Sequence, residues 1–201
     1  MREDIRQNRN NLKQLFDAIE TTDRSRKALI SDEALETAIH VITEQAALGG
    51  KLIFIGNGGS AAIASHMATD FWKNAGIKAI AFNDSSLLTC ISNDHGYEYV
   101  FEKSIEMFGE PSDVLIAISS SGKSENILRG VTAAQRKGLR VLTLSGFKSD
   151  NPLRGQGDIN FYVPASHYGH VEVIHHAICH CLIDVIIKNK SKKTERAISH
   201  E

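Results

Sequence analysis

The chain has few of the residues that mark specialised proteins: of 201 residues, 3 are proline, 3 cysteine and 1 tryptophan. The cysteines, Cys90, Cys179 and Cys181, are odd in number and lack framework spacing, which excludes a disulfide scaffold and favours reduced thiols in the cytoplasm. The sequence also has no internal repeat and no Pro/Gly-rich linker. These absences favour a single domain.

Long apolar runs and an excess of one charge are also missing. No run approaches the ~20 apolar residues of a membrane span, and the charged N-terminus MREDIRQNRNNLKQ has no apolar signal core. The net charge of −1 provides no field that attracts nucleic acid or an anionic membrane. We therefore expect a cytoplasmic protein that binds neither nucleic acid nor a membrane.

Apolar residues make up 42% of the chain and follow two successive spacing patterns. Helical spacing of apolar residues over 2–20 and 31–48 predicts an N-terminal helical hairpin. Five short apolar segments then alternate with helical ones, namely KLIFIG, KAIAF, DVLIAIS, RVLTLSG and INFYVP. Buried strands alternating with helices predict an α/β fold with a doubly wound, mostly parallel five-stranded sheet of flavodoxin type.

The chain closes with a long apolar helix from about His170, followed by the charged, aperiodic segment KNKSKKTERAISHE. We expect one domain over residues 1–190 and a disordered basic tail over 191–201. A nucleic-acid-binding arm is the alternative interpretation of that tail.

Two loops of unusual composition follow predicted strands, at the sheet edge where parallel sheets bind ligands: GNGGS and SSSGKSEN. The first matches a dinucleotide fingerprint only formally, because the acidic residue after the next strand, Asp84, lies too far along the chain. The second contains Gly-Lys-Ser, but Ala117 stands where a P-loop requires glycine. Neither nucleotide interpretation is favoured.

The second loop instead brings several hydroxyl groups to the N-terminus of a predicted helix. Its serines are Ser119, Ser120, Ser121 and Ser124. Helix N-termini bind anions, so these hydroxyls predict a site for one phosphate monoester. A helix N-cap alone is the alternative, but a cap needs one hydroxyl. In the first loop, Gly58 and Gly59 would let a ligand approach the backbone, and Ser60 would cap the next helix.

Two helices carry ionisable residues at spacings that place them on one face. His66 and Asp70 are four residues apart on the helix after the glycine loop, and Glu172 and His180 share a face of the closing helix. Two imidazoles and two carboxylates at a common point suit a divalent metal, zinc above all, or acid–base chemistry.

Two further histidines of the closing helix, His175 and His176, receive a different interpretation. His176 shares the face of Glu172 and His180, whereas His175 lies about 100° away around the helix axis. For both we favour a packing role, with the ring hydrogen-bonded inside the fold.

Several motifs in this order resemble the SIS (sugar isomerase) domain family, and its phosphoheptose isomerase subgroup in particular. They are GNGGSAA with the following His and Asp, SNDHGYE, GEPSDVLIAISSSGKSENIL and GLRVLTLSG, before a His-bearing last helix. The resemblance covers roughly residues 5–188. It implies a homotetramer built by the N-terminal helices, and isomerisation of sedoheptulose 7-phosphate to D-glycero-D-manno-heptose 7-phosphate through an enediolate in heptose biosynthesis.

The resemblance also implies roles for individual residues. Asn57, Gly58, Gly59, Ser60 and Glu172 would line the substrate site, and Asn93 and Asp94 would contact the sugar chain. The four serines would hold the phosphate. His66 and His180 fall on metal-ligand positions, and Asp70 and His180 on acid–base positions. With Asp70 and Glu172 added from the helix geometry, the expected metal ligands are His66, Asp70, Glu172 and His180.

Two departures from the family pattern keep alternatives open. Asp70 replaces the family's catalytic glutamate, and Glu172 replaces its glutamine. The shorter side chain changes the reach by roughly 1 Å where geometry governs rate, and the added charge tightens a cation but repels an anionic enediolate. A SIS isomerase for another sugar phosphate, or a non-catalytic SIS protein that binds a replication initiator, remains an alternative.

Overall fold

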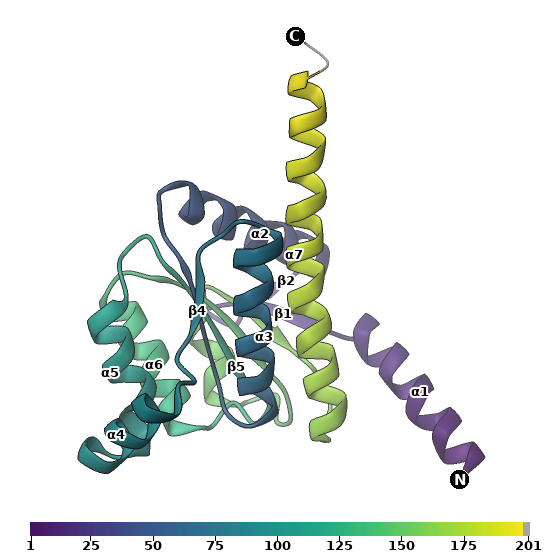
Figure 1. Cartoon of the computed structure of the whole chain (residues 1–201). Coiled ribbons are helices and arrows are strands. Elements are labelled where there is room, and N and C mark those ends of the chain that lie inside the picture. Colours follow the sequence, from purple (N-terminus) through teal and green to yellow (C-terminus); the bar gives the residue numbers. More distant parts are fainter. Residues whose placement is uncertain (199–201) are drawn as a thin grey trace.

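The computed structural model describes residues 1–198, with side chains as far as residue 192. Figure 1 shows a central sheet with helices on both faces. The helices are α1 (Arg2–Asp17), α2 (Ser31–Ala47), α3 (Gly59–Asn74), α4 (Ser85–His95), α5 (Val100–Phe108), α6 (Glu125–Arg136) and α7 (Tyr168–Ile198), with short 3-10 turns at Tyr97–Tyr99 and Pro152–Gly155. The strands are β1 (Glu20–Asp23), β2 (Ala28–Leu29), β3 (Leu52–Gly56), β4 (Ala79–Ala81), β5 (Val114–Ser119), β6 (Arg140–Ser145) and β7 (Ile159–Tyr162).

All five predicted strands are confirmed as β3 to β7, and they are parallel. Their spatial order, β4-β3-β5-β6-β7, is the flavodoxin order. Successive side chains of a strand face opposite sides of the sheet, and both sides are buried. Phe54 of β3 packs with α2, α3 and α7, whereas its neighbour Ile55 packs with α5 and α6. Uniformly apolar strands are therefore required here.

The sheet has seven strands in place of the predicted five. The two additional strands, β1 and β2, form a hairpin, and β1 pairs antiparallel with β7. Their segments, Glu-Thr-Thr-Asp and Ala-Leu, carry too few apolar residues to show a strand pattern. They form because β1 pairs with β7 and β2 pairs with β1. Asn160, which is fully buried, donates from Nδ2 to the carbonyl oxygens of Thr22 (3.1 Å) and Asp23 (3.0 Å).

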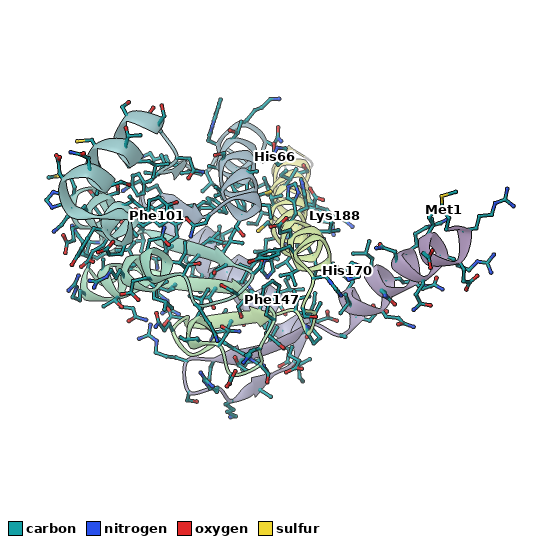
Figure 2. The ribbon with its side chains drawn as sticks, turned by 90° about the horizontal axis from the view of Figure 1, so that it is seen from below. Met1, His66, Phe101, Phe147, His170 and Lys188 are labelled. Atoms are coloured by element: carbon teal, nitrogen blue, oxygen red, sulfur yellow. The ribbon has the colours of Figure 1, made fainter. Side chains whose placement is uncertain are left out.

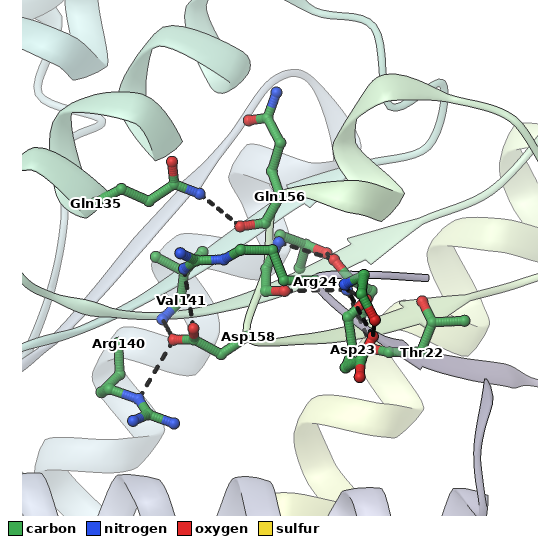
Figure 3. A network of polar contacts seen from close by, with 12 residues as sticks. Thr22, Asp23, Arg24, Gln135, Arg140, Val141, Gln156 and Asp158 are labelled. Atoms are coloured by element: carbon green, nitrogen blue, oxygen red, sulfur yellow. Dashed lines mark hydrogen bonds and ion pairs between the residues drawn. The ribbon is translucent and has the colours of Figure 1, made fainter. Parts of the chain in front are cut away.

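An ion-pair network holds this hairpin against β6 and β7, as Figure 3 shows. Asp158 lies at its centre, 2.9 Å from Arg24 Nη2 and 3.3 Å from Arg140 Nε, and it accepts a hydrogen bond from the Val141 backbone N–H at 2.8 Å. Nearby, Gln135 on α6 donates to the Gln156 carbonyl oxygen at 2.6 Å.

The first two helices are confirmed as elements, but the β1–β2 hairpin lies between them, so they form no helical hairpin. Helix α1 projects away from the sheet in Figure 1 and has no buried residue. Phe16 on this helix is 42% exposed. Residues 191–198 of the expected disordered tail belong to α7, and residues 199–201 lie outside the described part of the chain.

Helix α7 is long and apolar enough over Tyr168–Lys192 to cross a membrane by length and composition alone. Many of its apolar side chains lie in the core, however: Ile174, Ile178, Leu182 and Ile183 are each at most 3% exposed and pack with the residues of α2, α3 and the sheet. A core helix of a globular fold passes the same test.

Candidate active site

The chain reverses its direction of winding between β3 and β5, which are adjacent in the sheet. Ligands bind in the crevice at such a switch point, at the carboxyl ends of the strands. The glycine loop follows β3 and the serine loop follows β5, and between them lies an open cavity of about 240 Å³. Its lining is Asn57, Gly58, Gly59, Ser60, Ile118, Ser119, Ser120, Ser121, Ser124, Tyr168 and Glu172. Both predicted loops therefore face one site.

The serine loop leaves its hydroxyl groups available to a ligand. Ser124 occupies the N-cap position of α6, but its side chain makes no capping hydrogen bond, and its Oγ lies 3.5 Å from Ser119 Oγ. Ser120 is 4% exposed, and its Oγ has no hydrogen-bond partner among the described residues. A buried hydroxyl without a partner is costly, so this loop is arranged for an acceptor that an anion would supply.

Two glycines near the cavity stand where an added Cβ would meet another side chain. Gly122, in the serine loop, has φ +61°, and a Cβ there would overlap Asn151 Oδ1. In the glycine loop, a Cβ on Gly59 would lie 2.5 Å from both carboxylate oxygens of Glu172. The space beside Gly59 is thus occupied by the side chain of Glu172 on α7. Ser60 is in the first turn of α3 and does not cap it, because the N-cap residue is Gly58.

The side chain of Asn57 is held by residues that the sequence did not single out. Its amide and that of Asn126 exchange two hydrogen bonds of 2.9 Å, and Tyr97 Oη donates to Asn57 Oδ1 at 2.9 Å. Tyr97 belongs to the segment SNDHGYE, so that motif supports the glycine loop through its tyrosine. Tyr168, which also lines the cavity, carried no recognisable sequence signal.

Asn93 and Asp94 are exposed residues in the last turn of α4, and they are not part of the cavity lining. Asn93 Nδ2 donates to Asp94 Oδ1 at 2.8 Å. Their contact with a sugar chain stays a prediction.

Helices α3 and α7 lie side by side and run in the same direction (Figure 1). Gly59 faces Glu172 near their N-termini, and Lys190 donates to the Ala75 carbonyl oxygen at the other end. Between these points, His66 of α3 lies beside α7 (Figure 2), with its ring centroid 5.1 Å from that of His176 and 5.7 Å from that of His180. The shared alignment of the two helices thus builds a cluster of three imidazoles.

The histidine cluster (His66, His176 and His180) offers one ring nitrogen from each residue within 4.8 Å of the others. His176 Nε2 is buried and lacks a hydrogen-bond partner among the described residues. Burial, with the neighbouring rings of His180 and His66, lowers the pKa of His176. A lower pKa keeps the ring neutral, which is the form that binds metals.

The other two residues of the predicted ligand set lie at different distances from this cluster. Asp70 contacts it directly, with Oδ2 3.3 Å from His66 Nε2, and accepts a hydrogen bond from Asn74 at 3.2 Å. Glu172 lines the serine cavity beside Gly59, one helical turn before His176. Among the described residues, the ring nitrogens of His66, His176 and His180 converge. The joining of Asp70 and Glu172 to them as metal ligands stays a prediction.

His175 packs as expected from its position on the helix. It is fully buried, its Nε2 lies 3.1 Å from the Ser145 carbonyl oxygen, and burial lowers its pKa to about 4. The sequence analysis also assigned a packing role to His176. Its i, i+4 spacing to His180 is the sequence signal that distinguishes it from His175, because this spacing places both rings on one face of the helix.

Comparison with known proteins adds evidence to this geometry. The sequence model of the SIS domain matches residues 14–146. The chain belongs to the SIS domain family. The SIS relatives include the phosphoheptose isomerase of Proteus mirabilis, which is 37% identical over 187 residues, covering 89% of this chain and 96% of that protein.

Solved SIS structures share the fold. The phosphoheptose isomerase of Neisseria gonorrhoeae aligns with a TM-score of 0.72 at 32% identity, over 77% of this chain and 86% of that one. That of Francisella tularensis aligns with a TM-score of 0.73 at 30% identity, over 78% and 86%. A protein of Bacteroides fragilis, described as a putative phosphosugar isomerase involved in capsule formation, aligns with a TM-score of 0.70 at 22% identity, over 95% of this chain and 92% of that one, which shows the fold alone.

Proposed function

We propose that this SIS protein is a phosphosugar isomerase that converts sedoheptulose 7-phosphate to D-glycero-D-manno-heptose 7-phosphate. Relatives named phosphoheptose isomerase, 37–39% identical over most of their length, support the reaction. The observation that carries the proposal is the pairing of a serine-lined cavity with a cluster of ionisable side chains along the same two helices.

The distance between the two groups suits a long substrate. Gly59 borders the cavity, and His66 follows it by seven residues on α3, which corresponds to about 10 Å at 1.5 Å per residue. With its phosphate on the serines, an extended seven-carbon sugar phosphate reaches that far. A remote phosphate also supplies binding energy that positions the reacting carbons.

In the reaction, a base removes a proton from C1 of the open-chain ketose. An enediolate forms, the hydroxyl proton of the C1 oxygen is transferred to the C2 oxygen, and reprotonation at C2 gives the aldose. We assign the exchange of these protons to Asp70 and His180. The contact of the Asp70 carboxylate with His66 and the position of the His180 ring beside His66 support this assignment. Ser119, Ser120, Ser121 and Ser124 hold the phosphate during these steps.

The residues present also fit a divalent metal. The histidine cluster supplies nitrogen donors, and the orphaned Nε2 of His176 is the kind of buried atom that a metal ion satisfies. Zinc is the metal that three imidazoles suit best. When bound, it would stabilise negative charge on the substrate oxygens as a Lewis acid.

We further propose a homotetramer in the cytoplasm, with residues 1–190 as one domain. Helix α1 buries none of its residues within the chain and exposes Ile5 (55%) and Phe16 (42%). An isolated helix of 16 residues is marginally stable in water, so another copy of the chain is expected to cover it.

The test is incubation of the purified protein with sedoheptulose 7-phosphate, with the product followed by NMR. His180→Ala is expected to abolish turnover with little effect on phosphate binding, and Ser124→Ala to raise KM. A panel of other ketose phosphates tests whether the departures from the family pattern at Asp70 and Glu172 change the substrate. Turnover of another sugar phosphate alone would replace the proposed substrate, and wild-type kinetics in both variants would remove the proposed site.

A further inference from the structure

We propose that Tyr97 and Asn126 are positioning residues that make the side chain of Asn57 solely a hydrogen-bond donor toward the serine cavity, where it binds an acceptor oxygen of the sugar phosphate. This inference deepens the proposed function and rests on it for the identity of the ligand. The three residues come from separate segments, namely the loop after β3, the 3-10 turn after α4 and the first turn of α6.

The backbone of α6 determines the orientation of the Asn126 amide. This side chain is 3% exposed, and its Oδ1 accepts a hydrogen bond from the Ile127 backbone N–H at 3.0 Å. A backbone N–H can only donate, so the opposite orientation of the amide would place two donor groups against each other. Asn126 Nδ2 is therefore the group that faces its other neighbour, and it donates to Asn57 Oδ1 at 2.9 Å.

The amide of Asn57 is left with one group for a ligand. Its Oδ1 accepts from Asn126 Nδ2 and from Tyr97 Oη, both at 2.9 Å, which occupies both lone pairs of a carbonyl oxygen. Its Nδ2 carries two hydrogens, and within the described part of the chain it donates only one, to Asn126 Oδ1 at 2.9 Å. Because Asn57 lines the cavity, the remaining N–H is available to a bound molecule.

A side chain that can only donate discriminates between ligand groups, which the serines around it do not. A hydroxyl group rotates and can either donate or accept. The carboxylate of Glu172, which also lines the cavity, can only accept. Asn57 therefore favours an oxygen with free lone pairs, such as a phosphate or ketose carbonyl oxygen, and offers no acceptor to a ligand hydroxyl group.

The hydroxyl group of Tyr97 is the part of this arrangement that a substitution can remove alone. Tyr97 is 52% exposed, and phenylalanine keeps its ring, so Tyr97→Phe is expected to leave the packing of the turn intact. The Asn57 amide would lose one of its hydrogen bonds, and one lone pair of its Oδ1 would become open to water. The side chain would then offer an acceptor as well as a donor, and it would be held less firmly.

A double-mutant cycle tests this inference. The Kd of sedoheptulose 7-phosphate is measured by isothermal titration for the wild-type protein, Tyr97→Phe, Asn57→Ala and the double variant. Tyr97→Phe is expected to raise Kd by about 3- to 10-fold, the effect of one neutral hydrogen bond. In the Asn57→Ala protein it should have no further effect, because it acts through that residue. Tyr99→Phe, which keeps the ring that packs on Arg129, is the matched control and should bind normally.

Two further measurements accompany the cycle. Inorganic phosphate serves as a second ligand: if Tyr97→Phe weakens its binding too, the acceptor oxygen belongs to the phosphate group, and if only the sugar phosphate binds more weakly, it belongs to the sugar chain. The side-chain amide signals of the free ¹⁵N-labelled protein need no ligand, and those of Asn57 should shift in Tyr97→Phe and not in Tyr99→Phe. Asn57→Ser replaces Asn57→Ala if circular dichroism shows that the latter is unfolded.

Equal effects of Tyr97→Phe in the wild-type and Asn57→Ala proteins would overturn the inference, because the tyrosine would then act elsewhere. An unchanged Kd in Tyr97→Phe would also overturn it. If the protein isomerises sedoheptulose 7-phosphate while the effects of the two substitutions add, the inference fails and the proposed function stands. If the effects on Kd are not additive but no product forms, the inference stands and the proposed reaction fails. A wild-type protein that binds neither ligand would overturn both.

Discussion

Replacement of Ser120 by alanine is expected to change stability and binding in opposite directions. Ser120 Oγ is buried and lacks a partner in the described part of the protein, and such an atom costs about 1–3 kcal/mol. Its removal is expected to stabilise the free protein by about 1 kcal/mol, which raises Tm by about 2–4 °C in a chain of this size.

The same hydroxyl is expected to contribute to phosphate binding. A hydrogen bond to a charged group contributes about 1.5–3 kcal/mol, and about 1.4 kcal/mol corresponds to a factor of ten in Kd. Ser120→Ala should therefore raise the Kd of sedoheptulose 7-phosphate by about 10- to 150-fold. The assay combines thermal unfolding without ligand and isothermal titration with the sugar phosphate.

Ser104 provides a matched control, because it is also buried (2% exposed) but donates from Oγ to the Val100 carbonyl oxygen at 2.9 Å. Ser104→Ala loses a satisfied hydrogen bond and should lower stability by about 1 kcal/mol, with an unchanged Kd. The control is expected to have a lower Tm and an unchanged Kd. If Ser120→Ala behaves in the same way, the assignment of Ser120 to the phosphate site is refuted.

Three other predictions follow from local contacts. Gly59→Ala should displace the Glu172 carboxylate, 2.5 Å from the new Cβ, and raise KM several-fold while Tm moves little; unchanged kinetics would show that Glu172 does not face substrate. Asp113→Ala leaves the Lys51 ammonium group and the backbone N–H groups of Lys51 and Glu110 without their acceptor. It should lower the free energy of unfolding, measured by chemical denaturation, by about 3–5 kcal/mol, and a smaller loss would contradict this. Burial raises the pKa of Cys179 to about 12, so at pH 8 iodoacetamide should label exposed Cys90 and spare Cys179 until the protein unfolds, as mass spectrometry would reveal.

The predicted elements agree with the structure where the signal is local. The strands β3 to β7 are short and uniformly apolar, and the loops after β3 and β5 are rich in glycine and serine. These features depend on residues within a few positions of one another, so periodicity and composition identify them. The cavity between the two loops then follows from the rule for parallel sheets.

The histidine cluster illustrates what a single helix cannot reveal. Sequence spacing placed Glu172, His176 and His180 on one face of α7, but it carried no information on how far α7 slides along α3. In the structure, packing sets Gly59 against Glu172 and His66 against His176 and His180. A shift of one helical turn would have brought Glu172 to His66 instead.

The sequence by itself determined the α/β class, the positions of the five parallel strands and the two loops that line the cavity. Only the tertiary structure decided that β1 and β2 join the sheet through β7, that α1 projects away from the sheet, and which side chains of α3 and α7 meet. The physical reason is that strand recruitment and helix alignment depend on contacts between segments far apart in the chain, which local patterns do not encode.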